Sequence, residues 1–174
     1  MHKDEIADLI EEKHDLLLNW LKEQDDDKWL LGPEGKWTTG QQALHLLQSI
    51  KPLNDVLSMP RFFFKYVFGK NNRDIHNYDT IVHSYQEALT TTNNFTFKAS
   101  KNMKIPKIKD KTYILNRLQV ESKKLQYKTR RISDKNLDTL VLPHPLMGKI
   151  PIREILMWTA YHVEHHTKIL QEKY

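Results

Sequence analysis

The sequence contains no cysteine, and this absence excludes several classes of site. A chain without thiols has no disulfide framework, no thiolate nucleophile, no Cys-ligated zinc site and no iron–sulfur cluster. Glycine is scarce, with 5 residues in 174, and no glycine-rich phosphate-binding pattern occurs. No stretch approaches the ~18 apolar residues of a membrane span, and the charged start lacks the apolar core of a signal peptide. We therefore expect a cytoplasmic protein that does not enter the membrane.

Four long segments carry apolar residues at helical spacing, which predicts amphipathic helices. They are residues 3–23, a helix that opens after Trp37, residues 111–132, and a helix that begins at Pro151 and continues to residue 174. Thr39 and Gln42 have the spacing of a capping box in the second helix, and Pro52 predicts a kink or an end nearby. Strand signals are weak, with one brief alternation at residues 95–98. The pattern and the length favour one all-α domain over residues 1–174.

The connection between the second and third helices, residues 58–110, is longer than the ~2–8 residues usual in bundles. A short helix is expected within it, over residues 78–89. Its beginning, residues 61–68, is the most aromatic part of the chain. Two interpretations stay open. The rings cap one end of the bundle, or they form a lid, a hydrophobic substrate wall or a dimer contact.

Charge is unevenly distributed along the chain, whose formal net charge is +5. Residues 1–30 hold ten Asp or Glu and four Lys, whereas residues 98–131 hold twelve Lys or Arg and two acids. A basic segment can attract nucleic acid or another anionic ligand. However, aromatic residues do not interleave with these lysines as stacking on bases requires. We therefore favour a solvated basic helix face that pairs with the acidic first helix. A nucleic-acid or anion-binding module is the alternative.

The fourth helix carries His162 and His166, four residues apart. Residues at this spacing lie one turn apart on one helix face, so both imidazoles can turn toward a single ion. They fall on the stripe that should face the core, where an unsatisfied polar group costs about 1–3 kcal/mol. The spacing alone also fits two satisfied or partly exposed histidines. His165 lies at the stripe's edge, and Glu164 points to the opposite side, where we expect it to be solvated and a poor general base.

A useful metal site needs a third ligand, and His45 lies early in the second helix on the flank of its apolar stripe. Three neutral histidines suit Zn²⁺ or Ni²⁺ and leave positions for water or a substrate. A bound divalent metal would lower the pKa of water and polarise a substrate. His14, on the flank of the first helix, is a spare candidate that we interpret as structural.

Two stretches of the sequence resemble a known family in the right order. Residues 37–46, WTTGQQALHL, are similar to the segment that opens the second helix in the DinB-like superfamily. Residues 143–151, PHPLMGKIP, resemble that family's linker into its last helix, and residues 158–166, WTAYHVEHH, resemble its closing H-x-x-x-H signature. Residues 58–105 match nothing in that pattern and are interpreted as an inserted segment.

The resemblance implies a four-helix bundle with one long crossover, often dimeric, and a three-His site on facing helices. The ligands it implies are His45, His162 and His166. Relatives include bacillithiol- or mycothiol-dependent S-transferases, maleylpyruvate isomerases and proteins described as metal-dependent hydrolases. A homodimer and a small-molecule substrate are therefore expected. Since the chain has no Cys, S-transfer would need a low-molecular-weight thiol.

Glu121 is a candidate catalytic residue on the core-facing side of the third helix, where it would orient a ligand or act as a base. The alternative is a carboxylate at the stripe's edge that pairs with a Lys. Gln41, Gln48 and Ser49 are candidates for groups that support the metal ligands. The leading hypothesis is a metal-dependent enzyme, and the alternatives are a non-catalytic metal-binding bundle and a basic binding module.

Overall fold

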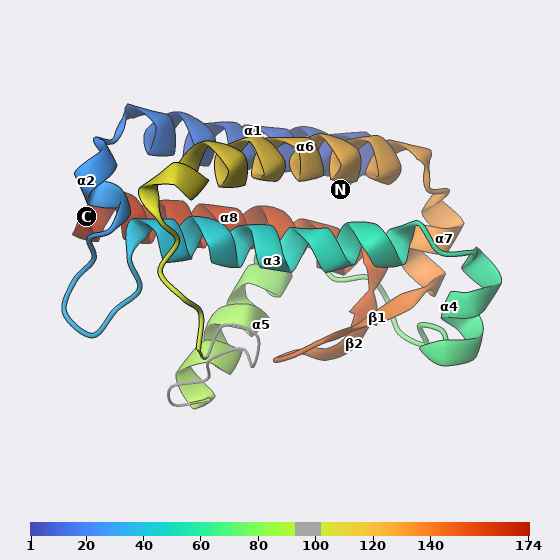
Figure 1. The fold of residues 1–174 in the computed structure, drawn as a ribbon. Coiled ribbons are helices and arrows are strands. Elements are labelled where there is room, and N and C mark those ends of the chain that lie inside the picture. Colours follow the sequence, from blue (N-terminus) through green and yellow to red (C-terminus); the bar gives the residue numbers. More distant parts are fainter. Residues whose placement is uncertain (93–101) are drawn as a thin grey trace.

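The computed structural model describes residues 1–92 and 102–174, and four long helices dominate it (Figure 1). These are α1 (Lys3–Glu23), α3 (Thr39–Leu57), α6 (Lys111–Arg131) and α8 (Ile152–Lys173). The prediction of an all-α four-helix bundle is confirmed, and the predicted bounds agree to within a residue where both ends were predicted. Pro151 is the N-cap of α8 rather than its first residue, and α6 ends one residue before position 132.

Consecutive long helices are not neighbours in this bundle. α1 packs against α6 and α8, and α3 packs against the same two helices, so α1 and α3 lie diagonally opposite each other. α3 and α6 run in the same direction, antiparallel to α1 and α8 (Figure 1). Two parallel helices in sequence require a chain that returns along the bundle. This explains the length of the connection between α3 and α6.

The connections hold the remaining elements. They are α2 (Asp26–Trp29), α4 (Arg61–Val67), α5 (Tyr78–Thr91), a 3₁₀ turn at Ile108–Asp110, α7 (Asp134–Thr139), β1 (Val141–His144) and β2 (Gly148–Pro151). The predicted helix at 78–89 is confirmed and extends to Thr91. The antiparallel β1–β2 hairpin was not predicted, because its strands are four residues each and carry two prolines. Residues 95–98 lie outside the described residues.

The start of α3 corrects the predicted capping box by one residue. Thr38 is the N-cap: its hydroxyl accepts from the Gln41 backbone N–H at 3.2 Å, and Gln41 Oε1 accepts from the Thr38 N–H at 2.9 Å. The predicted pair Thr39–Gln42 has the same spacing, but it lies one position into the helix. Gln42 is therefore left for the interior. Pro52 does not end α3, which continues to Leu57.

Trp29 closes one end of the core. Its side chain is 1% exposed and packs against the start of α3 at Gly40. A Cβ at Gly40 would lie 2.7 Å from Trp29 Cε2, closer than real Cβ contacts. The lack of a side chain at Gly40 is thus what allows the ring to lie against the helix.

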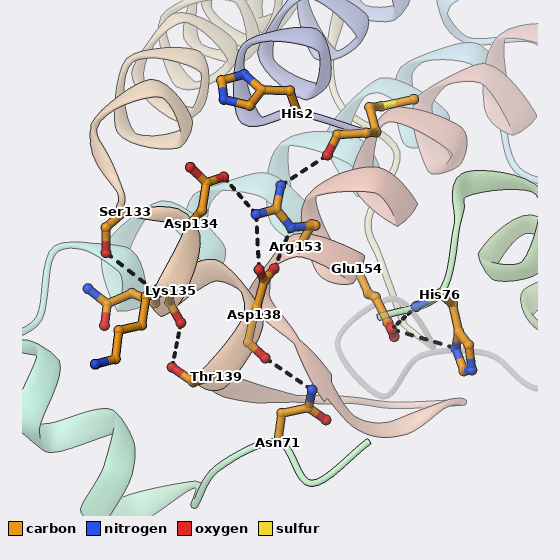
Figure 2. A network of polar contacts seen from close by, with 12 residues as sticks. His2, Asn71, His76, Ser133, Asp134, Lys135, Asp138, Thr139, Arg153 and Glu154 are labelled. Carbon is orange, nitrogen blue, oxygen red and sulfur yellow. Dashed lines mark hydrogen bonds and ion pairs between the residues drawn. The ribbon is translucent and has the colours of Figure 1, made fainter. Parts of the chain in front are cut away.

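The start of α8 is held by buried charges (Figure 2). Arg153 donates to Asp138, to Asp134 at 2.7 Å and to the Met1 carbonyl at 3.0 Å. We call the next pair the Glu154 clasp: Glu154 is fully buried and accepts from both Nη atoms of Arg73 at 2.6 and 2.7 Å. The His76 backbone N–H also donates to Glu154, at 2.9 Å.

The aromatic segment forms α4, which lies beside the end of α3, while the C-terminal end of α8 lies at the other end of the bundle (Figure 1). Phe64 is buried and Phe68 packs on the core, so these two rings fit the interpretation in which the segment caps one end of the bundle. Phe62 and Tyr66, however, are 76% and 92% exposed, which a simple cap does not explain.

The basic segment pairs with acids near the beginning of the chain, as favoured from the sequence. Arg130 contacts Asp8 at 2.8 Å, and Lys111 contacts Asp26 at 2.8 Å. α6 and α1 lie side by side (Figure 1), so these contacts join two faces of opposite charge. Within the described ranges, no helix combines the length and apolarity that a membrane crossing requires.

Candidate metal centre

Three histidines converge between the beginning of α3 and the later half of α8. They are His45 on α3 and His162 and His166 on α8, with 9%, 3% and 7% of their surface exposed. His45 Nε2 lies 3.1 Å from His162 Nε2, which lies 3.0 Å from His166 Nε2. The structure therefore brings together the three residues singled out in the sequence, and all three ligand atoms lie within 4.8 Å of one another.

The donor set and its spacing fit a divalent metal ion. Two nitrogens bound to one Zn²⁺ at ~2.0–2.1 Å lie roughly 2.9–3.4 Å apart in octahedral or tetrahedral coordination. The measured separations of 3.0 and 3.1 Å fall in this range. His162 Nδ1 is buried with no hydrogen-bond partner among the described residues, so direct hydrogen bonding leaves this ring incompletely satisfied. Only imidazoles form the cluster in the described part of the chain.

Burial keeps the three imidazoles neutral. It lowers the pKa of His45 to about 4, with a smaller contribution from His165. Burial also holds the pKa values of His162 and His166 well below their usual range, and the neighbouring histidines lower them further. Neutral imidazole is the form that binds a metal, because the cation has no free lone pair.

Tryptophan rings enclose the imidazoles. Trp37 lies 4.8 Å from His45 and is stacked at 6.4 Å on His166, measured between ring centroids. Trp158 is stacked on His162 at 4.7 Å. These rings restrict water around the cluster and limit ring rotation.

Gln42 is the neighbour that the sequence reasoning missed. Its Oε1 lies 2.5 Å from His166 Nδ1, and its amide nitrogen donates to the Tyr174 hydroxyl at 3.3 Å. A signal was present, because Gln42 lies three residues before His45 and so shares its helix face. The mistaken capping box assigned Gln42 to the helix end instead.

The other candidate supporting groups have different partners. Gln41 donates to the Met103 carbonyl at 2.7 Å in addition to its capping role, and the Ser49 hydroxyl donates to the Leu46 carbonyl at 2.9 Å. Gln48 Oε1 is buried without a partner among the described residues. The two hydrogen bonds, of Gln41 and Ser49, are thus made to backbone carbonyls and not to the histidine cluster.

Glu121 lies in a separate polar cluster. Its side chain is 2% exposed, accepts from Asn54 Nδ2 at 2.8 Å and pairs with Arg117 at 2.7 Å and Lys124 at 3.2 Å. Asn54 follows His45 by nine residues, or roughly 14 Å along α3 at ~1.5 Å per residue. These contacts match the alternative in which Glu121 pairs with a Lys, in a cluster apart from the imidazoles along α3.

His14 on α1 and Glu164 on α8 were also assigned roles from the sequence. His14 is buried and donates from Nδ1 to the Ile10 carbonyl at 2.8 Å, which fits the structural role expected for it. Glu164 is not simply solvated: it forms ion pairs with Lys168 at 2.5 Å and with Lys13 at 3.3 Å. Those cations come from α8 itself and from α1, whose side chains the sequence alone does not place.

Comparisons with known proteins agree with this architecture. The model of the DinB superfamily matches residues 9–170. Among solved structures, the chain is similar to YfiT from Bacillus subtilis, described as a probable metal-dependent hydrolase with an unusual four-helix bundle topology. The TM-score is 0.60 at 21% identity, over 98% of this chain and 84% of that one, and the likeness supports the fold. A comparison with curated protein sequences finds no match. From the family match over nearly its whole length, the chain belongs to the DinB superfamily.

Proposed function

We propose that this chain is a metal-dependent enzyme that acts on a small molecule, with His45, His162 and His166 as ligands of a divalent cation. The observation that carries the proposal is the convergence of three buried, neutral Nε2 atoms within 4.8 Å. Zn²⁺ and Ni²⁺ are the cations that three imidazoles suit. When bound, such a cation supplies Lewis acidity toward water or a substrate oxygen.

The residues of this chain would hold and enclose the reacting groups. The two α8 histidines and His45 fix one face of the site, and Trp37 and Trp158 restrict water on its flanks. Hydrolysis of a small molecule is the activity that we favour, and the printed description of YfiT, a probable metal-dependent hydrolase, supports it. S-transfer is the second candidate, for which a low-molecular-weight thiol would be the co-substrate because the chain has no Cys.

An open groove between α5 and α8 is a candidate approach for the substrate. It is lined by Tyr78 and Gln86 of α5 and by Tyr161, His165 and Lys168 of α8, among others. The His165 ring lies 5.4 Å from that of His166, so the groove borders the histidine cluster. We therefore place the substrate's entry on this face.

Metal analysis of the purified protein tests the proposal. We expect about one Zn²⁺ or Ni²⁺ per chain in the wild type and none in His162→Ala. His83→Ala is the matched control, because His83 is 73% exposed on α5 and should leave the metal content unchanged. Equal, negligible metal in the wild type and His162→Ala would overturn the metal site.

Activity assays on metal-loaded protein then separate the catalytic alternatives. Panels of ester, amide and phosphoester substrates test hydrolysis, and thiol-transfer assays with bacillithiol or mycothiol test S-transfer. Metal binding without turnover in both panels would favour the non-catalytic metal-binding bundle. The dimer and the cytoplasmic location stay predictions.

A further inference from the structure

The contact between Gln42 and His166 determines where the proton of this imidazole lies. The Gln42 carbonyl oxygen accepts hydrogen bonds only, so at 2.5 Å from His166 Nδ1 it requires the proton on Nδ1. A neutral imidazole carries one N–H. His166 Nε2 is then left with its lone pair, which faces His162 Nε2 at 3.0 Å and accepts from it in the metal-free protein.

The orientation of the Gln42 amide is itself fixed by its neighbours. The Tyr174 hydroxyl donates its single proton to the Trp37 carbonyl. The hydroxyl oxygen is then an acceptor toward the Gln42 amide nitrogen at 3.3 Å. An amide with its nitrogen toward Tyr174 must turn its oxygen toward His166, so the chain of hydrogen bonds has one direction. We call Trp37, Tyr174 and Gln42 the amide relay.

We propose that Gln42 is a positioning residue: through the amide relay it holds His166 in the Nδ1–H tautomer and presents the Nε2 lone pair to a cation. Only the statement about the cation rests on the proposed function. The tautomer of His166 is a property of the metal-free protein. Buried acceptors behind histidine ligands fix the ring and raise its basicity, and their loss typically weakens metal affinity by ~10–100-fold.

The other ligand on α8 has no such support. His162 Nδ1 is buried without a hydrogen-bond partner among the described residues, and Trp158 stacks on the face of this ring. Packing therefore holds His162, whereas a directed hydrogen bond holds His166. This contrast predicts that substituting Gln42 changes the protonation of His166 directly, and that of His162 only through the Nε2···Nε2 contact at 3.0 Å.

The tautomer is measured directly in the metal-free protein by long-range ¹H–¹⁵N NMR of the histidine rings. We expect the Nδ1–H signature for His166 in the wild type and its loss or mixing in Gln42→Leu, which has nearly the same size but no acceptor. Gln42→Glu keeps an acceptor and should retain the signature. Identical His166 signals in the wild type and Gln42→Leu would overturn the proposal.

The consequence for binding is measured by competition between the protein and a chelator for Zn²⁺. Gln42→Leu should bind roughly 10–100-fold more weakly than the wild type, and Gln42→Glu should restore the affinity. Gln48→Leu is the matched control, since Gln48 lies on the same helix and its Oε1 has no described partner. Weakening by the same factor in both Leu variants would show a general packing effect and contradict the proposal.

A milder variant guards against misfolding of Gln42→Leu. Tyr174→Phe removes only the hydroxyl that orients the amide, so it should give a mixed His166 tautomer and an affinity loss smaller than that of Gln42→Leu. An unchanged His166 tautomer in Tyr174→Phe would contradict the claim that Tyr174 orients the Gln42 amide. If the wild type binds no Zn²⁺, the proposed function fails, while the NMR measurement still decides the tautomer.

Discussion

The start of α8 and its middle turns both bury polar side chains, and they satisfy them in opposite ways. At the first turn, Glu154 receives two hydrogen bonds from Arg73 and, as Figure 2 shows, one from the His76 backbone. Two to three turns later, His162 and His166 direct Nε2 atoms at each other, and His162 Nδ1 has no partner among the described residues.

This difference separates a structural polar cluster from a binding one. The Glu154 carboxylate receives three hydrogen bonds from the segment around residues 73–76, and these hold that segment against the start of α8. Neutral nitrogens that crowd one point keep lone pairs available, and a cation would use them. We therefore expect stability to depend mainly on the start of α8, and metal binding to depend on its middle turns.

The largest effect is expected at the Glu154 clasp. Arg73→Met removes the guanidinium from the fully buried Glu154 carboxylate and leaves only the contacts with His76. Since Arg73 is 35% exposed, we expect a cost near the lower end of the roughly 3–5 kcal/mol of a buried pair. Denaturant unfolding measures the loss. Lys65→Met, at an exposed position on α4, should change the free energy of unfolding by less than about 0.5 kcal/mol. The metal affinity of folded Arg73→Met should match the wild type; a parallel loss of affinity would contradict the division.

Metal binding should stabilise the protein through the middle turns of α8. At a free Zn²⁺ concentration 100 times Kd, the expected gain is about 2.7 kcal/mol, because the cation binds the folded chain. Unfolding with Zn²⁺ and with excess chelator measures it. Arg73→Met should keep this gain and His162→Ala should lose it. An equal gain in His162→Ala would place the stabilising cation elsewhere.

Acid should destabilise the metal-free protein through its buried histidines. Burial lowers the pKa of His14 to about 4, so the unfolded chain, with an ordinary value near 6.5, binds the proton first as the pH falls. The free energy of unfolding is therefore at its full value above pH ~6.5 and falls between pH ~6.5 and 4. At pH 5, His14 should account for about 2 kcal/mol of this loss. Unfolding in His14→Asn between pH 8 and 5 should show a shallower loss than in the wild type. Equal slopes would contradict burial as the cause.

The smallest effect is expected at Glu121. Glu121→Gln keeps the contact with Asn54 and loses two ion pairs to partly exposed partners, Arg117 and Lys124, so it should cost about 1 kcal/mol. Its Zn²⁺ affinity should stay within twofold of the wild type. A large loss of turnover at unchanged affinity and stability would instead support the catalytic role predicted from the sequence.

The long helices were predictable because their apolar stripes repeat over many turns, and each turn adds to the same signal. Its place early in the second helix made His45 a candidate third ligand, and the family resemblance then supported it, because periodicity does not say which helices are neighbours. The diagonal placement of α1 and α3 shows this limit: adjacency in sequence would have paired them.

The errors lie where one residue decides between local alternatives. Thr38 and Thr39 are both followed by Gln three positions later, so two overlapping capping boxes fit the same letters. Packing selects Thr38 and thereby turns Gln42 inward to His166. The hairpin at residues 141–151 was missed because strands of four residues with prolines carry too little alternation to detect.

The close approach at Gly40 couples the residue at position 29 to the residue at position 40. A methyl group on this glycine would push the indole away from the first turn of α3, five residues before His45. Gly40→Ala alone should therefore loosen the approach of the ligand-bearing helix, and a smaller ring in Gly40→Ala/Trp29→Phe should recover part of the loss. In natural chains that share this architecture, we expect the residue types at the two positions to vary together. A large ring should occur with glycine, and a smaller ring with alanine.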